Sequence, residues 1–336
     1  MSIAISLGPA RVRSTTAAAD GVALIEVVPE TGTVAHPAGA HLVVEVLVGG
    51  RLQIRRYSLV GEHPEDGVYR IAVRLQPGGR GGSAYMHQLA PGAEVRISRP
   101  VSGFELAWGQ PGYLLLAGGI GITPLIGMAE ALRRRHVPVR LVYAGRSRSA
   151  MPFLKPLVEL LGDHLSVVAD DEGTGADLAA ELARLPEQGA AYMCGPPGFM
   201  NAVRSAWEDQ GRPPGLLRFE SFASGGEHPA EAFTMEVAET GARVTVPADT
   251  SALDALREAG VEMMYDCRRG ECGLCSVRVV RCDGALDHRD VFLSDRQKAD
   301  GERMCVCVSR AVGGVVTVDT GMRPDPDRRT ARAVTP

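Results

Sequence analysis

Short apolar runs separated by glycine and proline turns fill the first third of the chain. The runs lie at residues 22–28, 41–48, 69–75 and 94–98. Runs of this length and spacing are typical of the strands of a small antiparallel barrel. A helical pattern interrupts them only after Gly82. The pattern therefore predicts an antiparallel β-barrel domain over residues 1–107.

From Gly112 the pattern changes to apolar strands that alternate with helices. The predicted strands are residues 113–117, 139–144, 165–169, 190–194 and 217–222, and the predicted helices are residues 125–135 and 199–210. This alternation predicts an α/β domain with a parallel sheet over residues 108–222. Such sheets bind their ligands at the carboxyl ends of the strands.

A third module follows residues 223–231, which have the composition of a linker. Its predicted strands are residues 233–238, 243–247, 276–281 and 315–318. A helix at residues 251–259 is expected to be capped by Asp249, Thr250 or Ser251. Together with the segment 287–296, these elements predict an α+β domain of the β-grasp type over residues 232–320. We expect the tail, residues 321–336, to be disordered.

Composition narrows the class of protein. Of the 336 residues, 45% are hydrophobic and 23% are charged, as in globular chains. No apolar run approaches the roughly 18 residues that cross a bilayer. A net charge of −4 gives no general attraction to nucleic acid. The N-terminus does not resemble a signal peptide, and seven cysteines do not resemble a disulfide set. We therefore expect a cytoplasmic monomer without a membrane or nucleic-acid partner.

The strongest chemical signal is the spacing of Cys267, Cys272 and Cys275. Their C-x4-C-x2-C pattern is that of a loop around a plant-type 2Fe-2S cluster. Gly270 and Gly273 suit a loop that turns its amides toward sulfur atoms. Zinc, a disulfide scaffold and buried thiols are the alternatives. Structural zinc usually has two separated cysteine pairs, and disulfide scaffolds are typical of short secreted chains, so the spacing favours the cluster.

Two segments of the predicted barrel could bind one flat, phosphorylated ligand. Arg55, Tyr57 and Ser58 lie on one strand, where a guanidinium, a ring and a hydroxyl could meet such a ligand. The second segment is the turn Gly81, Gly82 and Ser83. Its free amides at a helix start suit a phosphate, with Arg55 as the counter-charge. An ordinary half-exposed strand and a flexible glycine loop are the alternatives.

The predicted α/β domain has three candidate nucleotide segments, each directly after a strand. They are Gly119, Gly121, Thr123 and Pro124, then Arg146 and Ser147, then Cys194, Gly195 and Pro196. Glycines before a helix allow a pyrophosphate to approach the backbone, although the spacing is not G-x-G-x-x-G. The Cys194 turn makes a thin wall for a flat ring. A core position is the alternative for Cys194 by itself.

Three modules in this order resemble the phthalate dioxygenase reductase and vanillate O-demethylase oxidoreductase family. The resemblance covers roughly residues 8–320 and rests on several motifs. They are Arg55-x-Tyr57-Ser58, Gly81-Gly82-Ser83, residues 117–124, Cys194-Gly195-Pro196, Phe219-Glu220-x-Phe222, the cysteine loop, His288-Arg289-Asp290 and Cys307-Val308-Ser309-Arg310. The resemblance implies an FMN barrel, a nicotinamide-nucleotide domain and a C-terminal 2Fe-2S ferredoxin.

The resemblance also implies a function. NADH would pass a hydride to FMN, and single electrons would leave through the 2Fe-2S cluster to a separate terminal oxygenase, most simply of the Rieske non-haem iron type. Ser58 would face flavin N5, Cys194 would adjoin the nicotinamide, Glu220 would be a polar neighbour, and Phe222 would cover part of the flavin. The alternatives are a haem-thiolate monooxygenase as partner, a redox sensor with a vestigial flavin site, FAD in place of FMN, and NADPH gripped by Arg146, Ser147 and Arg148.

The fourth cluster ligand is ambiguous by counting, because Cys305 and Cys307 lie two residues apart. The family's spacing would select Cys305, whereas the Cys-x-Ser-Arg context selects Cys307. An insertion in the turn around Cys282 explains the difference, because insertions in turns cost little. We predict that Cys307 is the ligand and that Cys282 and Cys305 are free thiols, with Cys305 as a rescue ligand. The acceptor is predicted to dock near the loop residues Tyr265, Arg268, Arg269 and Glu271.

Overall fold

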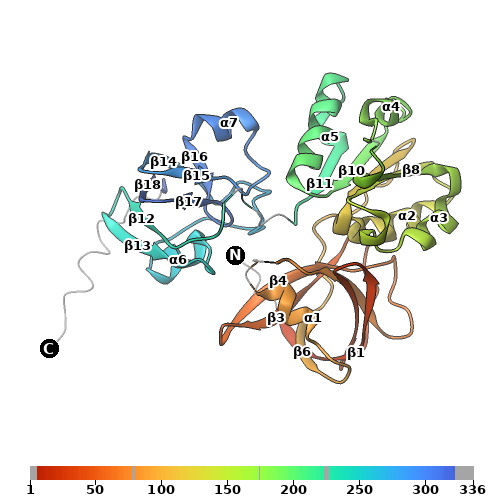
Figure 1. Cartoon of the computed structure of the whole chain (residues 1–336), viewed down its shortest axis with the longest axis horizontal. Coiled ribbons are helices and arrows are strands. Elements are labelled where there is room, and N and C mark those ends of the chain that lie inside the picture. The colour runs from red at the N-terminus through yellow and green to blue at the C-terminus, as the bar shows by residue number, and fades with distance from the viewer. Residues whose placement is uncertain are drawn as a thin grey trace. The chain divides into compact units, whose positions relative to one another are not determined.

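A computed structural model describes residues 6–77, 79, 81–173, 175–222, 226 and 228–321 of the chain. The chain divides into two compact units, Met1–Phe222 and Ala223–Pro336 (Figure 1). The first unit contains two hydrophobic cores and the second unit contains one. The tail predicted at residues 321–336 lies, apart from Gly321, outside the described residues.

The first core belongs to a six-stranded antiparallel sheet with the order β4-β3-β6-β1-β2-β5. Its strands are β1 (Leu7–Ala19), β2 (Val22–Pro29), β3 (His41–Val48), β4 (Arg51–Ser58), β5 (Tyr69–Arg74) and β6 (Glu94–Ser98). An isolated bridge between Leu59 and Ile71 joins the segment after β4 to β5, so the two edges of the sheet meet. Helix α1 (Gly82–His87) follows β5 at the predicted place.

The second core belongs to a five-stranded parallel sheet with the order β11-β10-β7-β8-β9. Its strands are β7 (Tyr113–Gly118), β8 (Val139–Gly145), β9 (Leu165–Ala169), β10 (Ala190–Cys194) and β11 (Leu217–Glu220). The helices between them are α2 (Thr123–Arg134), α3 (Leu154–Leu161), α4 (Leu178–Ala183) and α5 (Pro197–Asp209). Because all five strands are parallel, their carboxyl ends lie along one edge of the sheet.

The second unit is built on a mixed sheet with the order β13-β12-β18-β14-β16. Its strands are β12 (Phe233–Val237), β13 (Ala242–Val246), β14 (Ser276–Cys282), β16 (Arg303–Cys305) and β18 (Val315–Asp319). A two-stranded sheet of β15 (Ala285–Asp287) and β17 (Arg310–Val312) and the helices α6 (Ala252–Glu258) and α7 (Asp295–Asp300) complete it. Of the three predicted capping residues of α6, Ser251 accepts the hydrogen bond, from the amide of Asp254 at 3.1 Å.

Among the described residues, no helix is both long enough and apolar enough to cross a bilayer.

Candidate functional site

Three of the predicted site residues meet where β10 and β11 end. Cys194 pairs with Ala117 of β7 on one side and with Glu220 of β11 on the other. Ser58, the last residue of β4, donates a hydrogen bond from its hydroxyl to the Glu220 carboxylate at 3.3 Å. Ser58 and Glu220 are 4% and 1% exposed. Phe222, two residues beyond β11, is 40% exposed. The barrel thus contributes a hydroxyl to the edge of the parallel sheet where the strands end.

The two predicted glycine turns of the parallel sheet pack directly against each other. A β-carbon on Gly121 would lie 2.1 Å from the carbonyl oxygen of Cys194. A β-carbon on Gly118 would lie 2.6 Å from Cδ of Pro196 and 3.1 Å from Cα of Gly195. Real β-carbons do not approach other atoms so closely, so this contact requires glycine. Gly118 belongs to the motif of residues 117–124, but its requirement for glycine is set by a segment far along the chain.

The start of α2 continues this edge. Gly119 has φ 54°, and the Thr123 hydroxyl donates to the carbonyl of Ile120 at 3.1 Å, with Pro124 in the first turn of the helix. The Arg74 guanidinium of β5 lies 3.8 Å from where a β-carbon on Gly119 would stand. Arg74 is therefore a basic neighbour of the predicted pyrophosphate turn that the sequence analysis missed, because an isolated arginine at a strand end has no distinctive pattern.

An ion pair that the sequence did not reveal joins the segment after β8 to the segment after β9. Arg148 donates to both carboxylate oxygens of Glu172, at 2.6 and 3.1 Å, and both side chains are exposed. The hydroxyls of Ser147 and Ser149 lie 3.1 Å apart, and the carbonyl of Arg146 accepts from the amide of Asp171 at 3.1 Å. Arg148, one of the basic residues expected at a 2′-phosphate, therefore already has an anionic partner.

The predicted phosphate segments of the barrel also lie together. A β-carbon on Gly82 would stand 2.5 Å from Nε of Arg55, so the guanidinium lies against the start of α1. Gly81 has φ 75°. The Ser83 hydroxyl accepts from the amide of Gln76 at 3.0 Å. Burial lowers the pKa of Arg55 and raises the pKa of Tyr57, its neighbour on the same face of β4.

The cysteine loop presents amides to sulfur atoms, as expected. Gly270 and Gly273 have φ 73° and 72°. The Cys267 sulfur accepts from the amides of Arg269 and Cys272, each at 3.4 Å. A β-carbon on Gly273 would stand 2.2 Å from the ring of Phe292, which lies flat against the loop. Both positive φ values and this contact account for glycine at the two positions.

Two further cysteines, Cys305 and Cys307, lie close to Cys275 of the loop. Hydrogen bonds from the thiols of Cys305 and Cys307 hold the pKa of Cys275 well below the usual value of a thiol. The Gly270 amide also forms a hydrogen bond to the Cys307 sulfur, and the charge of Asp290 acts on Cys305. No three histidine, cysteine or carboxylate groups of the described residues surround one point as a single metal ion requires. A 2Fe-2S cluster instead uses four thiolates shared between two irons. Cys267, Cys272, Cys275 and one of Cys305 and Cys307 could supply four such thiolates. Both Cys305 and Cys307 lie beside Cys275, so the choice of Cys307 stays a prediction.

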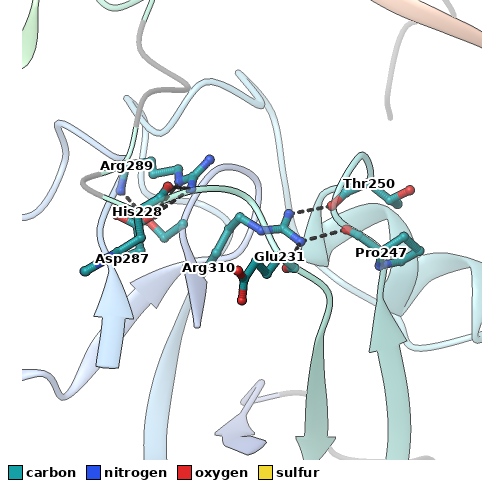
Figure 2. Close-up of polar contacts among 8 residues, drawn as sticks. His228, Glu231, Pro247, Thr250, Asp287, Arg289 and Arg310 are labelled. Carbon is teal, nitrogen blue, oxygen red and sulfur yellow. Dashed lines mark hydrogen bonds and ion pairs between the residues drawn. The ribbon is translucent and has the colours of Figure 1, made fainter. Parts of the chain in front are cut away.

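Two buried arginines of the second unit form hydrogen bonds with the segment before β12 (Figure 2). Arg289 pairs with Asp287 at 2.6 Å and donates to the carbonyl of His228 at 2.9 Å. Arg310, of the Cys-x-Ser-Arg motif, donates to three carbonyls, those of Glu231, Pro247 and Thr250, at 3.0, 2.7 and 2.8 Å. These bonds hold His228 and Glu231, at the end of the predicted linker 223–231, against the rest of the second unit.

Comparison with known proteins agrees with this arrangement. Residues 16–106 match the oxidoreductase FAD-binding domain family, and residues 235–312 match the 2Fe-2S iron-sulfur cluster binding domain family. A vanillate O-demethylase oxidoreductase of Pseudomonas sp. strain HR199 is 38% identical over 288 residues, which are 84% of this chain and 89% of that protein. A solved structure of phthalate dioxygenase reductase is 30% identical, with a TM-score of 0.74, over 94% of this chain and 98% of that one. The chain belongs to the family of these two reductases.

A second relative, a putative toluene-4-sulfonate monooxygenase system reductase subunit of Comamonas testosteroni, is 37% identical over 289 residues, 84% of this chain and 88% of that protein. As a member of the reductase family, the chain is an electron-transferring oxidoreductase with flavin-binding, nucleotide-binding and 2Fe-2S domains. The predicted resemblance and fold class are confirmed.

Proposed function

We propose that this chain is the NADH-dependent reductase component of an oxygenase system. It takes electrons from NADH through FMN and a 2Fe-2S cluster to a separate terminal oxygenase of the Rieske non-haem iron type. The observation that carries this proposal is the meeting of Ser58, Cys194 and Glu220 beside the glycine turns, in a chain that also holds the cluster loop. The relative named as a monooxygenase system reductase subunit supports an oxygenase as the acceptor.

The chain's own residues bind and orient the carriers. When bound, the flavin exchanges electrons in pairs or singly, and the cluster exchanges them singly. Arg55, against the glycine turn at Gly82, provides the counter-charge for the FMN phosphate. The contact between Gly121 and the Cys194 turn leaves backbone, rather than side chains, facing the nucleotide. No side chain acts as a nucleophile or a general base.

Anaerobic rapid mixing with NADH tests this function. Flavin absorbance should bleach first and cluster absorbance should follow, with electrons passing on to a one-electron acceptor. Mass analysis of the released flavin should give FMN. A chain whose flavin stays oxidised with NADH would instead be a redox sensor with a vestigial flavin site, and release of FAD would overturn the choice of FMN.

Ser58→Ala should slow flavin reduction by NADH about tenfold, equivalent to about 1.4 kcal/mol. The substitution removes the hydroxyl that donates a hydrogen bond to the Glu220 carboxylate at 3.3 Å. The flavin should remain bound, because Arg55 and the Gly82 turn are untouched. Stopped-flow reduction at saturating NADH measures the effect. Ser14→Ala, at another β-strand serine of the barrel with a carboxylate partner, is the control and should leave the rate unchanged.

Glu172→Gln should raise kcat/KM for NADPH relative to NADH by a few fold. We propose that NADH is preferred because Glu172 occupies Arg148, which would otherwise be available to a 2′-phosphate. Both side chains are exposed, so the change should be on the scale of a surface ion pair. Glu159→Gln, on the exposed face of α3, is the control. An unchanged preference in Glu172→Gln would contradict this role.

We propose that the oxygenase docks beside the cluster loop, around Tyr265, Arg268, Arg269 and Glu271, because electron transfer requires proximity. Arg269 pairs with Glu271 at 2.9 Å and Arg268 pairs with Asp254, so these arginines also hold the loop itself. The nearby apolar side chain of Met264 is 63% exposed.

Met264→Gln is therefore the cleaner test of this docking surface. It should raise KM for the oxygenase while leaving flavin reduction by NADH and the cluster spectrum unchanged. Val158→Gln removes a comparably exposed apolar side chain, 50% exposed on α3, and should have no effect on either step. An unchanged KM in Met264→Gln would show that the oxygenase docks on another surface.

A further inference from the structure

The motif His288-Arg289-Asp290 has no role in the proposed function, yet its aspartate side chain is completely buried. The Asp290 side chain has 0% exposure and accepts two hydrogen bonds. One comes from the Ser309 hydroxyl at 2.9 Å and the other from the amide of Leu293 at 2.9 Å. Nδ1 of His288 lies 3.6 Å from the same carboxylate. A buried charge is costly unless it is paired and bonded, so this position requires an explanation.

Ser309 connects the carboxylate to the turn that carries Cys307. Its hydroxyl also accepts from the amide of Arg289 at 3.1 Å, so it bridges the two motifs. The amides of Ser309 and Val308 in turn donate to the carbonyl of Cys305, at 2.9 and 3.1 Å. The turn between Cys305 and Ser309 is therefore fixed at one end by the strand β16 and at the other by Asp290.

Asp290 also contacts the cluster loop, at Gly270. A β-carbon on Gly270 would stand 2.8 Å from Cα of Asp290 and 2.7 Å from the Val308 side chain. The Gly270 carbonyl accepts from the amides of Val291 and Phe292, each at 3.0 Å. Gly270 lies between Cys267 and Cys272, so the cluster loop rests on the segment that begins with Asp290.

We infer that Asp290 is a positioning residue for the iron-sulfur site, holding the Cys307 turn against the cluster loop and lowering the cluster's reduction potential through its buried negative charge. Reduction adds one electron to the cluster, and a nearby anion disfavours that added charge. Ser309 mediates the positioning, because its hydroxyl joins the Asp290 carboxylate to the turn that carries Cys307. The inference rests on the 2Fe-2S site and not on the identity of the acceptor.

Asp290→Asn and Ser309→Ala separate the two parts in the full-length protein loaded with flavin and cluster. Asp290→Asn keeps an acceptor oxygen but removes the charge, so the midpoint potential of the cluster should become more positive. Ser309→Ala keeps the charge but removes the bridge, so iron should be released several-fold faster to a chelator while the potential changes less. Spectroelectrochemical titration and the rate of loss of cluster absorbance are the measurements.

Asp283→Asn is the matched control, because that carboxylate is 35% exposed and pairs with Arg281 in a turn of the same unit. It should change neither quantity. The inference is overturned if Asp290→Asn has the potential of the unaltered protein, or if Asp283→Asn shifts the potential equally. Should Asp290→Asn fail to take up a cluster, Ser309→Ala decides: faster iron release supports the inference, and an unaltered rate overturns it. Neither outcome depends on turnover with an oxygenase.

Discussion

Gly121→Ala is expected to lower kcat/KM for NADH by about 10- to 100-fold. The new methyl group would stand 2.1 Å from the Cys194 carbonyl oxygen, so the two turns of the proposed nucleotide site must separate. Overpacking of this kind typically costs about 1–3 kcal/mol, and each 1.4 kcal/mol or so is a factor of ten in rate. The loss should appear in nucleotide binding and in flavin reduction, because the Cys194 turn adjoins the proposed nicotinamide site.

Gly198→Ala is the control for this substitution. Gly198 lies on α5, close in sequence to the same turn, and no atom lies within 4 Å of a β-carbon built there. Stopped-flow flavin reduction over a range of NADH concentrations compares the two variants, and the cluster spectrum should be unaltered in both. Equal rates in Gly121→Ala and the unaltered protein would show that the contact between the turns is not needed for hydride transfer.

This contact marks a limit of what the sequence could predict. The glycine turn before α2 and the turn after Cys194 are each recognisable locally, because glycines after an apolar strand have few other uses. That Gly118 must be glycine because Pro196 lies against it follows only from the pairing of β7 with β10. The contact between Ser58 and Glu220 is likewise not predictable locally, because the two residues are 162 positions apart in the sequence.

The elements that the sequence analysis missed have weak local patterns for physical reasons. Strand β1 contains Pro9 and many small or polar residues, and of its thirteen residues only Ala10 and Val12 are buried core positions. Helix α3 includes Pro156, and Phe153, the residue before the helix, has φ 62°. Tertiary packing overrides the local preference in each case. The ion pair between Arg148 and Glu172 is likewise invisible in sequence, because the two residues follow different strands.

Cys307→Ser should abolish, or shift strongly, the visible absorption and the paramagnetic signal of the cluster. The Cys307 sulfur lies beside Cys275 and the amide of Gly270, so it is the predicted fourth thiolate and its loss would leave the cluster one ligand short. Flavin reduction by NADH should continue, because that step needs no residue of the second unit. Iron content, absorbance and paramagnetic resonance of the purified variant are the measurements.

Cys305→Ser is the matched control, and the two variants together decide the fourth ligand. Cys305 ends β16, where it pairs with Ser276 of β14, and it is 0% exposed. A serine there can still donate a hydrogen bond to Cys275, so no buried group loses its partner and the cluster should be nearly unchanged. Loss of the cluster in Cys305→Ser with retention in Cys307→Ser would reverse the assignment. Partial retention in Cys307→Ser that disappears when Cys305 is also replaced would show that Cys305 serves as a rescue ligand, as its position beside Cys275 allows.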